Sequence, residues 1–212
     1  MSDTDMVVKA NVLREWIEGL RLVRKEHLVA ALFLVMGISL IGESTGRVVI
    51  IPFIKDVVHG NALALGWIIT AQGLGGVLGS LFNTRLSKLL SPAIVIAFGG
   101  IACGVTMWIE VVFPVLPVVL LAAFLAGAPV VFFFTGLYTL LQRSVADAYR
   151  GRVFGAYGTT NTLLLLIGMS LSSALTAQFG VVLMLALLGI FYFLAGVTAL
   201  VLLRGVKKGS NF

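Results

Sequence analysis

Six long apolar segments constrain this chain more than any other feature of its sequence. Each is about as long as the roughly 20 apolar residues that a helix needs to cross the hydrocarbon core of a bilayer. Charged residues make up only 11% of the chain, whereas a soluble domain carries about 25%. A water-soluble globule and a disordered chain are therefore excluded, and we predict an all-α membrane protein. The predicted transmembrane helices cover residues 28–54, 66–84, 93–112, 118–141, 153–178 and 181–203.

Positive charges gather in every second loop, and this distribution predicts the topology. With the N-terminus in the cytoplasm, thirteen of the fifteen Lys and Arg residues fall on the cytoplasmic side. Loops rich in Lys and Arg stay in the cytoplasm, so we expect both termini to be cytoplasmic. The same distribution explains the net charge of +6 without a nucleic-acid partner.

The ends of the chain are expected to lie outside the transmembrane domain, which covers residues 28–203. Residues 1–27 form a cytoplasmic lead-in without the apolar core of a signal peptide. Within it, residues 12–23 place apolar side chains at helical spacing, which favours a helix lying on the membrane surface. A plain solvated lead-in is the alternative. Residues 204–212 form a cytoplasmic tail.

Four polar side chains inside the spans are candidates for a substrate or ion pathway. Glu43 and Arg47 are four residues apart, so they share a helix face and can pair. Ionisable groups inside a membrane suggest function by default. Alternatively, Arg47 snorkels toward the outer interface and Glu43 only neutralises it. Gln72 and Asn161 either contact substrate or hydrogen-bond between helices.

Polar residues are concentrated in the first, second, fourth and fifth spans, which we therefore expect to face a polar interior. The third and sixth spans are nearly uniformly apolar and are expected to face lipid. Glu110 is an exception within the third span. It stands near the outer end, where we expect it to be solvated.

Glycine and proline positions predict how the helices pack. Gly75 and Gly79 are separated by three residues, a spacing that lets two membrane helices approach closely. In the fourth span, Gly127 and Pro129 favour a kink, because proline removes a backbone hydrogen bond. This kink is either a hinge or an inert bend.

Signals of enzymatic chemistry are sparse. The sequence has no H-E-x-x-H motif, no G-x-S-x-G motif and a single cysteine. Its two histidines, His27 and His59, flank the first span on opposite sides of the membrane. We therefore predict no catalytic residues, no metal site and no cofactor. An intramembrane enzyme would need catalytic groups that converge near the midplane.

Three stretches resemble segments of a known family. Residues 18–28 resemble the linker into the seventh helix of its members. Residues 79–88 resemble the loop between helices eight and nine, with Asn83 where an acidic residue is usual. Residues 141–155 resemble the loop between helices ten and eleven, most specifically in the run Arg-Gly-Arg-Val-Phe-Gly at 150–155. The sequence thus resembles the C-terminal half of a major facilitator superfamily transporter, in particular of the bacterial drug, macrolide and siderophore exporters.

The resemblance implies a fold, a mechanism and a partner. The fold is a 3+3 inverted repeat of six helices, about 28–112 and 118–203, which is half of a twelve-helix major facilitator fold. The implied activity is export of a small amphipathic compound by alternating access, coupled to protons, across the bacterial inner membrane. Besides the lipid bilayer, the implied partner is a second six-helix half or another copy of the chain. The residues implied in a cytoplasmic gate are Gly79, Asn83, Arg85, Lys88, Asp147, Arg150 and Arg152.

The sequence also allows functions of a different class. The chain is either part of a transporter, or a non-transporting membrane interaction or assembly subunit, or an inert half-transporter fragment. Flux after reconstitution discriminates between these alternatives.

Overall fold

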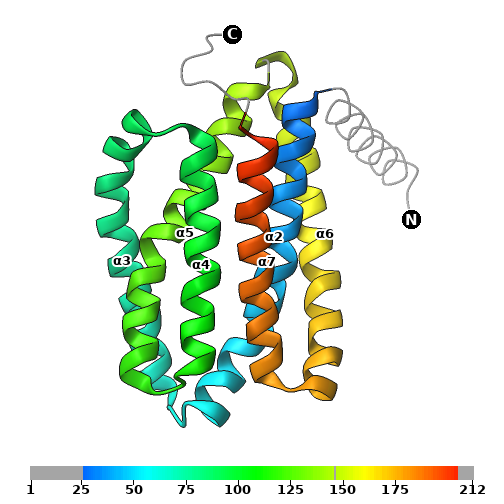
Figure 1. The fold of residues 1–212 in the computed structure, drawn as a ribbon. Coiled ribbons are helices and arrows are strands. Elements are labelled where there is room, and N and C mark those ends of the chain that lie inside the picture. Colours follow the sequence, from blue (N-terminus) through cyan, green and yellow to red (C-terminus); the bar gives the residue numbers. More distant parts are fainter. Residues whose placement is uncertain (1–25, 146, 205–212) are drawn as a thin grey trace, which may run out of the picture.

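The computed structural model describes residues 26–145 and 147–204. Within these residues, six helical segments are long and apolar enough to cross a membrane, and no strand is present. This confirms the predicted all-α architecture with six spans. The helices run side by side as one bundle (Figure 1). Their bounds are α2 (His27–Pro52), η1 (Phe53–Val57), α3 (Ala62–Leu89), α4 (Pro92–Val112), α5 (Leu116–Ser144), α6 (Asp147–Phe179) and α7 (Val181–Leu202).

The predicted surface helix of the lead-in falls in residues 1–25, outside the described residues, as does most of the tail, residues 205–212. The first described helix begins at His27 and the last ends at Leu202. The domain bounds of 28–203 stay a prediction.

The first span continues past its proline and ends at Val57, slightly beyond the predicted end at residue 54. Pro52 lies inside the helix, and the chain continues as the π-helical turn η1 to Val57. In this wide turn the Val58 N–H donates to the Phe53 carbonyl, at 3.1 Å. The whole span has 31 residues, or about 46 Å at 1.5 Å per residue, which exceeds the roughly 30 Å core of a bilayer.

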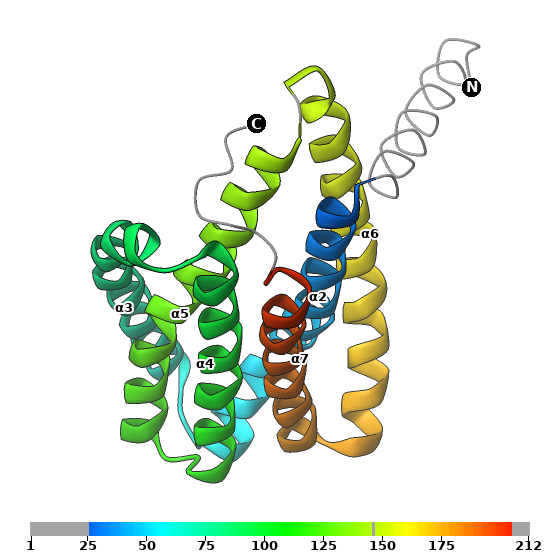
Figure 2. The same cartoon turned by 45° about the horizontal axis from the view of Figure 1, so that its top comes forward.

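Helices α4 and α7 pack against each other at the centre of the bundle. Helix α4 also contacts α5, which contacts α3, while α7 also contacts α2, which contacts α6. Figures 1 and 2 place α3 and α6 at opposite edges. In an 18-residue apolar stretch of each helix, the bundle buries only 22% of α3 and 6% of α6, against 50% of α4 and 39% of α7.

The contact between α4 and α7 gives the third and sixth spans a packed side, and the lipid-facing role expected for their other side stays a prediction. Small residues draw α4 and α7 together, so that a β-carbon added to Gly100 would lie 2.8 Å from the Gly196 Cα. One added to Gly104 would lie 2.6 Å from the Gly189 carbonyl oxygen. An apolar composition therefore describes both the lipid-facing side and the tightly packed side of these two helices.

The close approach predicted for Gly75 and Gly79 is confirmed. A β-carbon on Gly75 would collide with the Phe124 carbonyl of α5, and one on Gly79 would collide with Ala128. The two helices therefore pack backbone to backbone along α3, as the spacing of small residues predicts.

The neighbour pattern has an internal symmetry. If α2, α3 and α4 are exchanged with α5, α6 and α7 in order, the set of closely packed pairs is unchanged. The pair of α3 with α5 becomes α6 with α2, and α4 with α5 becomes α7 with α2. An inverted repeat requires this property, and the repeat itself stays a prediction.

Candidate functional site

A cavity opens between α2, α5 and α6, where α5 makes few contacts with the other two helices. Its volume is about 170 Å³. The lining combines charged, polar and apolar groups. The residues that line it are Met36, Ser39, Leu40, Glu43, Arg47, Phe134, Tyr138, Tyr157, Asn161 and Leu165.

Glu43 is held from two sides. The Arg47 Nη2 lies 3.0 Å from Glu43 Oε1, one helical turn further along α2. The Tyr192 hydroxyl of α7 donates to Glu43 Oε2, at 3.0 Å. The side chains of Glu43 and Arg47 are still 34% and 55% exposed, because they line the open cavity. The predicted pair is therefore formed, with both members facing the same space.

The distance of Arg47 from the outer interface stays a prediction. We expected it close to the outer interface, where snorkelling is easy. Because the helix continues through Pro52 to Val57, about 15 Å of chain follows Arg47 at 1.5 Å per residue. Its guanidinium is directed along the helix to Glu43 rather than only outward.

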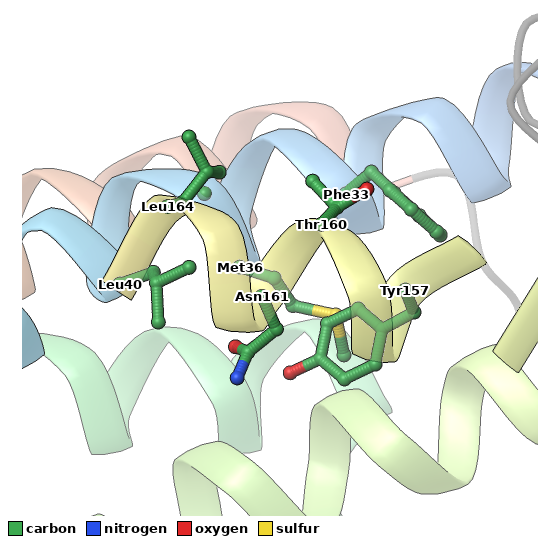
Figure 3. A pocket seen from close by; sticks show the side chains of 8 residues that line it. Phe33, Met36, Leu40, Tyr157, Thr160, Asn161 and Leu164 are labelled. Carbon is green, nitrogen blue, oxygen red and sulfur yellow. The ribbon is translucent and has the colours of Figure 1, made fainter. Parts of the chain in front are cut away.

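Asn161 lines the opposite wall on α6. It also lines a smaller adjoining cavity of about 30 Å³, together with Phe33 and Thr160. Figure 3 shows the amide of Asn161 and the ring of Tyr157 projecting from the same side of α6. The Tyr157 ring packs edge-on against Phe33, with centroids 5.9 Å apart. This wall therefore offers an amide beside an aromatic surface.

Two tyrosines bridge the side of the cavity between α5 and α6. The hydroxyls of Tyr138 and Tyr157 lie 3.1 Å apart, and their rings pack edge to face at 5.7 Å. Few other contacts join these two helices within the described residues. The tyrosine pair therefore bounds the cavity on this side.

Gln72 is not part of this constellation. It lies on α3, and its backbone carbonyl oxygen is packed against Gly127 of α5. It lines neither of the two cavities described above. Three of the four predicted pathway residues, Glu43, Arg47 and Asn161, thus come together in space, and their role in transport stays a prediction.

Comparison with known proteins identifies the family. The sequence matches the model of the Major Facilitator Superfamily over residues 28–211. The chain belongs to the Major Facilitator Superfamily. This confirms the resemblance seen in the sequence, and with its six apolar helices the chain is a multi-pass membrane protein.

A curated relative of this superfamily member is the multidrug efflux pump Tap of Mycolicibacterium fortuitum. The two are 28% identical over 144 residues, which is 66% of this chain and 34% of Tap. The match thus covers about a third of the length of that relative. No solved structure matches the chain.

The first segment predicted to form a cytoplasmic gate is helical rather than a loop. Helix α3 runs to Leu89, so Asn83, Arg85 and Lys88 continue the helix that packs Gly79 against α5. The loop was expected because the apolar run ends here. A change from apolar to polar residues marks the membrane surface, but it does not mark the end of a helix. The side chains of Arg85 and Lys88 lie outside the described part of the structure.

The second segment predicted to form a gate joins the ends of α5 and α6. Arg150 Nη2 lies 2.8 Å from Asp147 Oδ1 and donates to the Gln142 carbonyl of α5, at 3.1 Å. Arg152 is exposed. Arg150 therefore ties the start of α6 to the end of α5, and a gating role for these residues stays a prediction.

The proposed hinge lies in the packed part of the superfamily fold. Gly127 and Pro129 are both buried, and α5 continues through them as one helix from Leu116 to Ser144. A β-carbon on Gly127 would collide with the backbone of α3. Gly127 is thus required for close packing, and its role as a hinge stays a prediction.

Glu110 corrects another expectation. It is only 3% exposed, although it stands near the outer end of its span. It lies on the buried face of α4 that also carries Cys103 and Thr106. Position along a span predicts depth in the membrane, but it does not predict which way a side chain faces.

In the described part of the chain, no three His, Cys, Asp or Glu side chains gather as metal ligands.

Sequence reasoning missed Tyr192, which contacts the charged pair from the sixth span. That span was treated as featureless, yet a tyrosine in an apolar helix is a usable signal, because a buried hydroxyl needs a hydrogen-bond partner. Tyr157 and Phe134 were also missed. Their positions in the cavity wall follow from the packing of α5 and α6 around α2, which no local pattern encodes.

Proposed function

We propose that this chain forms the C-terminal half of a secondary transporter that exports a small amphipathic compound by alternating access, coupled to protons. The observation that carries the proposal is the ion pair of Glu43 and Arg47 in the wall of a cavity, in a member of the Major Facilitator Superfamily. The name of the relative Tap, a multidrug efflux pump, supports export. The charge distribution supports cytoplasmic termini in a bacterial inner membrane.

The composition of the cavity suits an amphipathic substrate. Apolar surface comes from Met36, Leu40 and Phe134, while Glu43 and Asn161 supply hydrogen-bonding groups within the same space. Ligand sites commonly combine mostly apolar walls with a few placed polar groups. A compound with an apolar body and one polar or charged end fits this division.

Proton coupling would use Glu43. Its carboxylate shares a negative charge between Arg47 and the Tyr192 hydroxyl while facing the cavity. Proton uptake would cancel that charge and leave Arg47 without its ion partner. Because the pair lines the cavity, the charge offered to a substrate would change with the protonation of a single group.

The partner would be a second six-helix half, which would cover α3 and α6. These helices are the least buried of the six. Added β-carbons at Gly66 and Gly73 on α3, and at Gly155 and Gly158 on α6, would meet nothing within 4 Å. Such bare glycines leave room for close helix packing. The matched part is only 34% of the length of Tap, so that relative is long enough to contain another half.

Efflux from proteoliposomes tests the proposal. The chain is purified with whatever partner it retains and reconstituted, and export of a fluorescent amphipathic dye is followed after a proton gradient is imposed. Glu43→Gln should lower gradient-driven export to a small but measurable residual rate while leaving the assembly intact. Export that proceeds equally well in Glu43→Gln would contradict the proposed role of Glu43. A stable complex without any export would favour the assembly-subunit alternative.

A further inference from the structure

We propose that Tyr192 is a positioning residue that fixes the carboxylate of Glu43 in the cavity wall by anchoring it to a second helix. This inference rests on the proposed transport role of Glu43. It adds a residue from α7, a helix that lines neither described cavity.

The contact is specific and buried. Tyr192 is 6% exposed, and its hydroxyl donates to Glu43 Oε2, at 3.0 Å. Its ring packs edge-on against Phe133, with centroids 5.9 Å apart, and Phe133 is itself fully buried. A buried tyrosine hydroxyl needs a hydrogen-bond partner, and Glu43 supplies it across the interface of α2 and α7. The ring is therefore fixed by packing, and its hydroxyl is directed at one oxygen atom.

The two partners of Glu43 act differently. Arg47 is on the same helix, four residues away, so it moves together with Glu43 whenever α2 moves. Tyr192 is on α7, which packs against α4 in the centre of the bundle. Of these two contacts, only the one with Tyr192 fixes the carboxylate relative to the rest of the bundle.

This division matters when Glu43 gains a proton. A neutral carboxylic acid no longer holds Arg47 by charge, whereas it still accepts a hydrogen bond from a phenol through its carbonyl oxygen. Tyr192 therefore keeps the Glu43 side chain in place in both protonation states. Proton uptake then frees Arg47 toward the cavity without moving Glu43 out of it.

Infrared spectroscopy tests the contact without relying on transport. The full chain in membranes is compared with Glu43→Gln to isolate the carboxylate stretching band of Glu43. Tyr192→Phe keeps the packed ring and removes the hydroxyl, so it should shift this band. Tyr138→Phe is the matched control, because it removes a hydroxyl that lines the cavity but is bonded to Tyr157 instead of Glu43. A band that is the same in Tyr192→Phe and in the unmodified chain would overturn the proposal.

A double-mutant cycle on export tests the consequence. Tyr192→Phe should lower kcat/KM for export by about tenfold, the factor expected when a hydrogen bond to a charged group is lost. In the Glu43→Gln background it should cause no further loss, because Tyr192 acts through Glu43. Losses that simply multiply would overturn the positioning role. If Glu43→Gln alone leaves export unchanged, the proposed function fails, while the infrared result still decides whether Tyr192 holds the carboxylate.

Discussion

Glu43 and Arg47 place two opposite charges inside an apolar helix, and each lowers the free-energy cost of placing the other there. A charge near the bilayer centre costs at least about 2.5 kcal/mol. The ion pair at 3.0 Å lowers this cost, and the Tyr192 hydroxyl supplies a second hydrogen bond to the carboxylate. At the scale of single residues, the site is therefore a balanced group of three side chains and not an isolated acid.

Removing one member of the pair should be worse than removing both. Arg47→Met leaves the Glu43 carboxylate without its ion partner, whereas Arg47→Met combined with Glu43→Gln leaves no charge. We expect the single variant to be the less stable by about 1 kcal/mol, since half-exposed ion pairs contribute little more than that. Thermal aggregation midpoints in mild detergent measure the difference. Arg47→Lys, which keeps the charge, is the control, and a double variant less stable than the single one would contradict mutual compensation.

The sequence predicted the Glu43–Arg47 pair because both residues belong to one helix, where spacing alone sets their distance. The contact with Tyr192 joins residues from the first and last spans, and no local spacing encodes it. Glu110 was misjudged for a related reason. Its depth followed from the apolar run, but its burial depends on which neighbours α4 meets.

At the scale of helices, small residues decide which pairs approach closely. Gly75 and Gly79 place α3 against α5, and Gly104 places α4 against Gly189 of α7. The first contact was predicted because the glycines recur at a regular spacing in a polar-bearing span. The second was not, because the uniform apolar composition of the third and sixth spans gave no reason to expect a packed face there.

Gly75→Ala should destabilise the bundle, and Gly73→Ala should not. A β-carbon on Gly75 collides with the Phe124 carbonyl, whereas one on Gly73 meets nothing within 4 Å. Overpacking of this kind costs about 1–3 kcal/mol. The yield of monodisperse protein and its thermal aggregation midpoint in detergent check the prediction. Equal behaviour of the two variants would contradict the backbone contact between α3 and α5.

Helix ends were the least predictable feature at this scale. Hydropathy locates the apolar part of each span, while hydrogen bonding decides where the helix stops. Pro52 is followed by a π-helical turn, and α3 continues past the apolar region to Leu89. For this reason, the first predicted gate loop is helical.

At the scale of the whole molecule, the charge distribution predicts that the α3–α4 and α5–α6 connections face the cytoplasm. A cysteine at Ser87, in a background in which Cys103 is replaced by Ala, reports on the first of these. An impermeant maleimide added to intact cells should leave it unlabelled, and inside-out vesicles should allow labelling. A cysteine at His59, on the expected outer side, is the control and should label in intact cells. Labelling of the Ser87 variant from outside would place the α3–α4 connection on the outer side and contradict the predicted topology.

The bundle also predicts that the chain does not carry out coupled transport as a monomer. Its cavity is bounded by α2, α5 and α6, while α3 and α6 bury little of their surface within the described structure. Alone in a bilayer, the half-exposed side chains of Glu43 and Arg47 would face lipid or a water defect instead of a closed pathway. A second half would cover this side and place the site at the repeat interface, where secondary transporters bind their substrates.

Cross-linking in membranes, followed by flux at known stoichiometry, checks this prediction. We expect proton-driven export only from particles that hold at least twelve spans, either two copies of the chain or the chain with a second half. Cysteines introduced at the open glycines Gly73 and Gly155 should cross-link to the partner, whereas a cysteine at Ile94, an exposed position on α4, should not. Because the same liposomes report stoichiometry and flux, export from vesicles that each hold one six-span chain would show that the bundle closes its own pathway. In that case α3 and α6 face lipid, and their bare glycines have another cause.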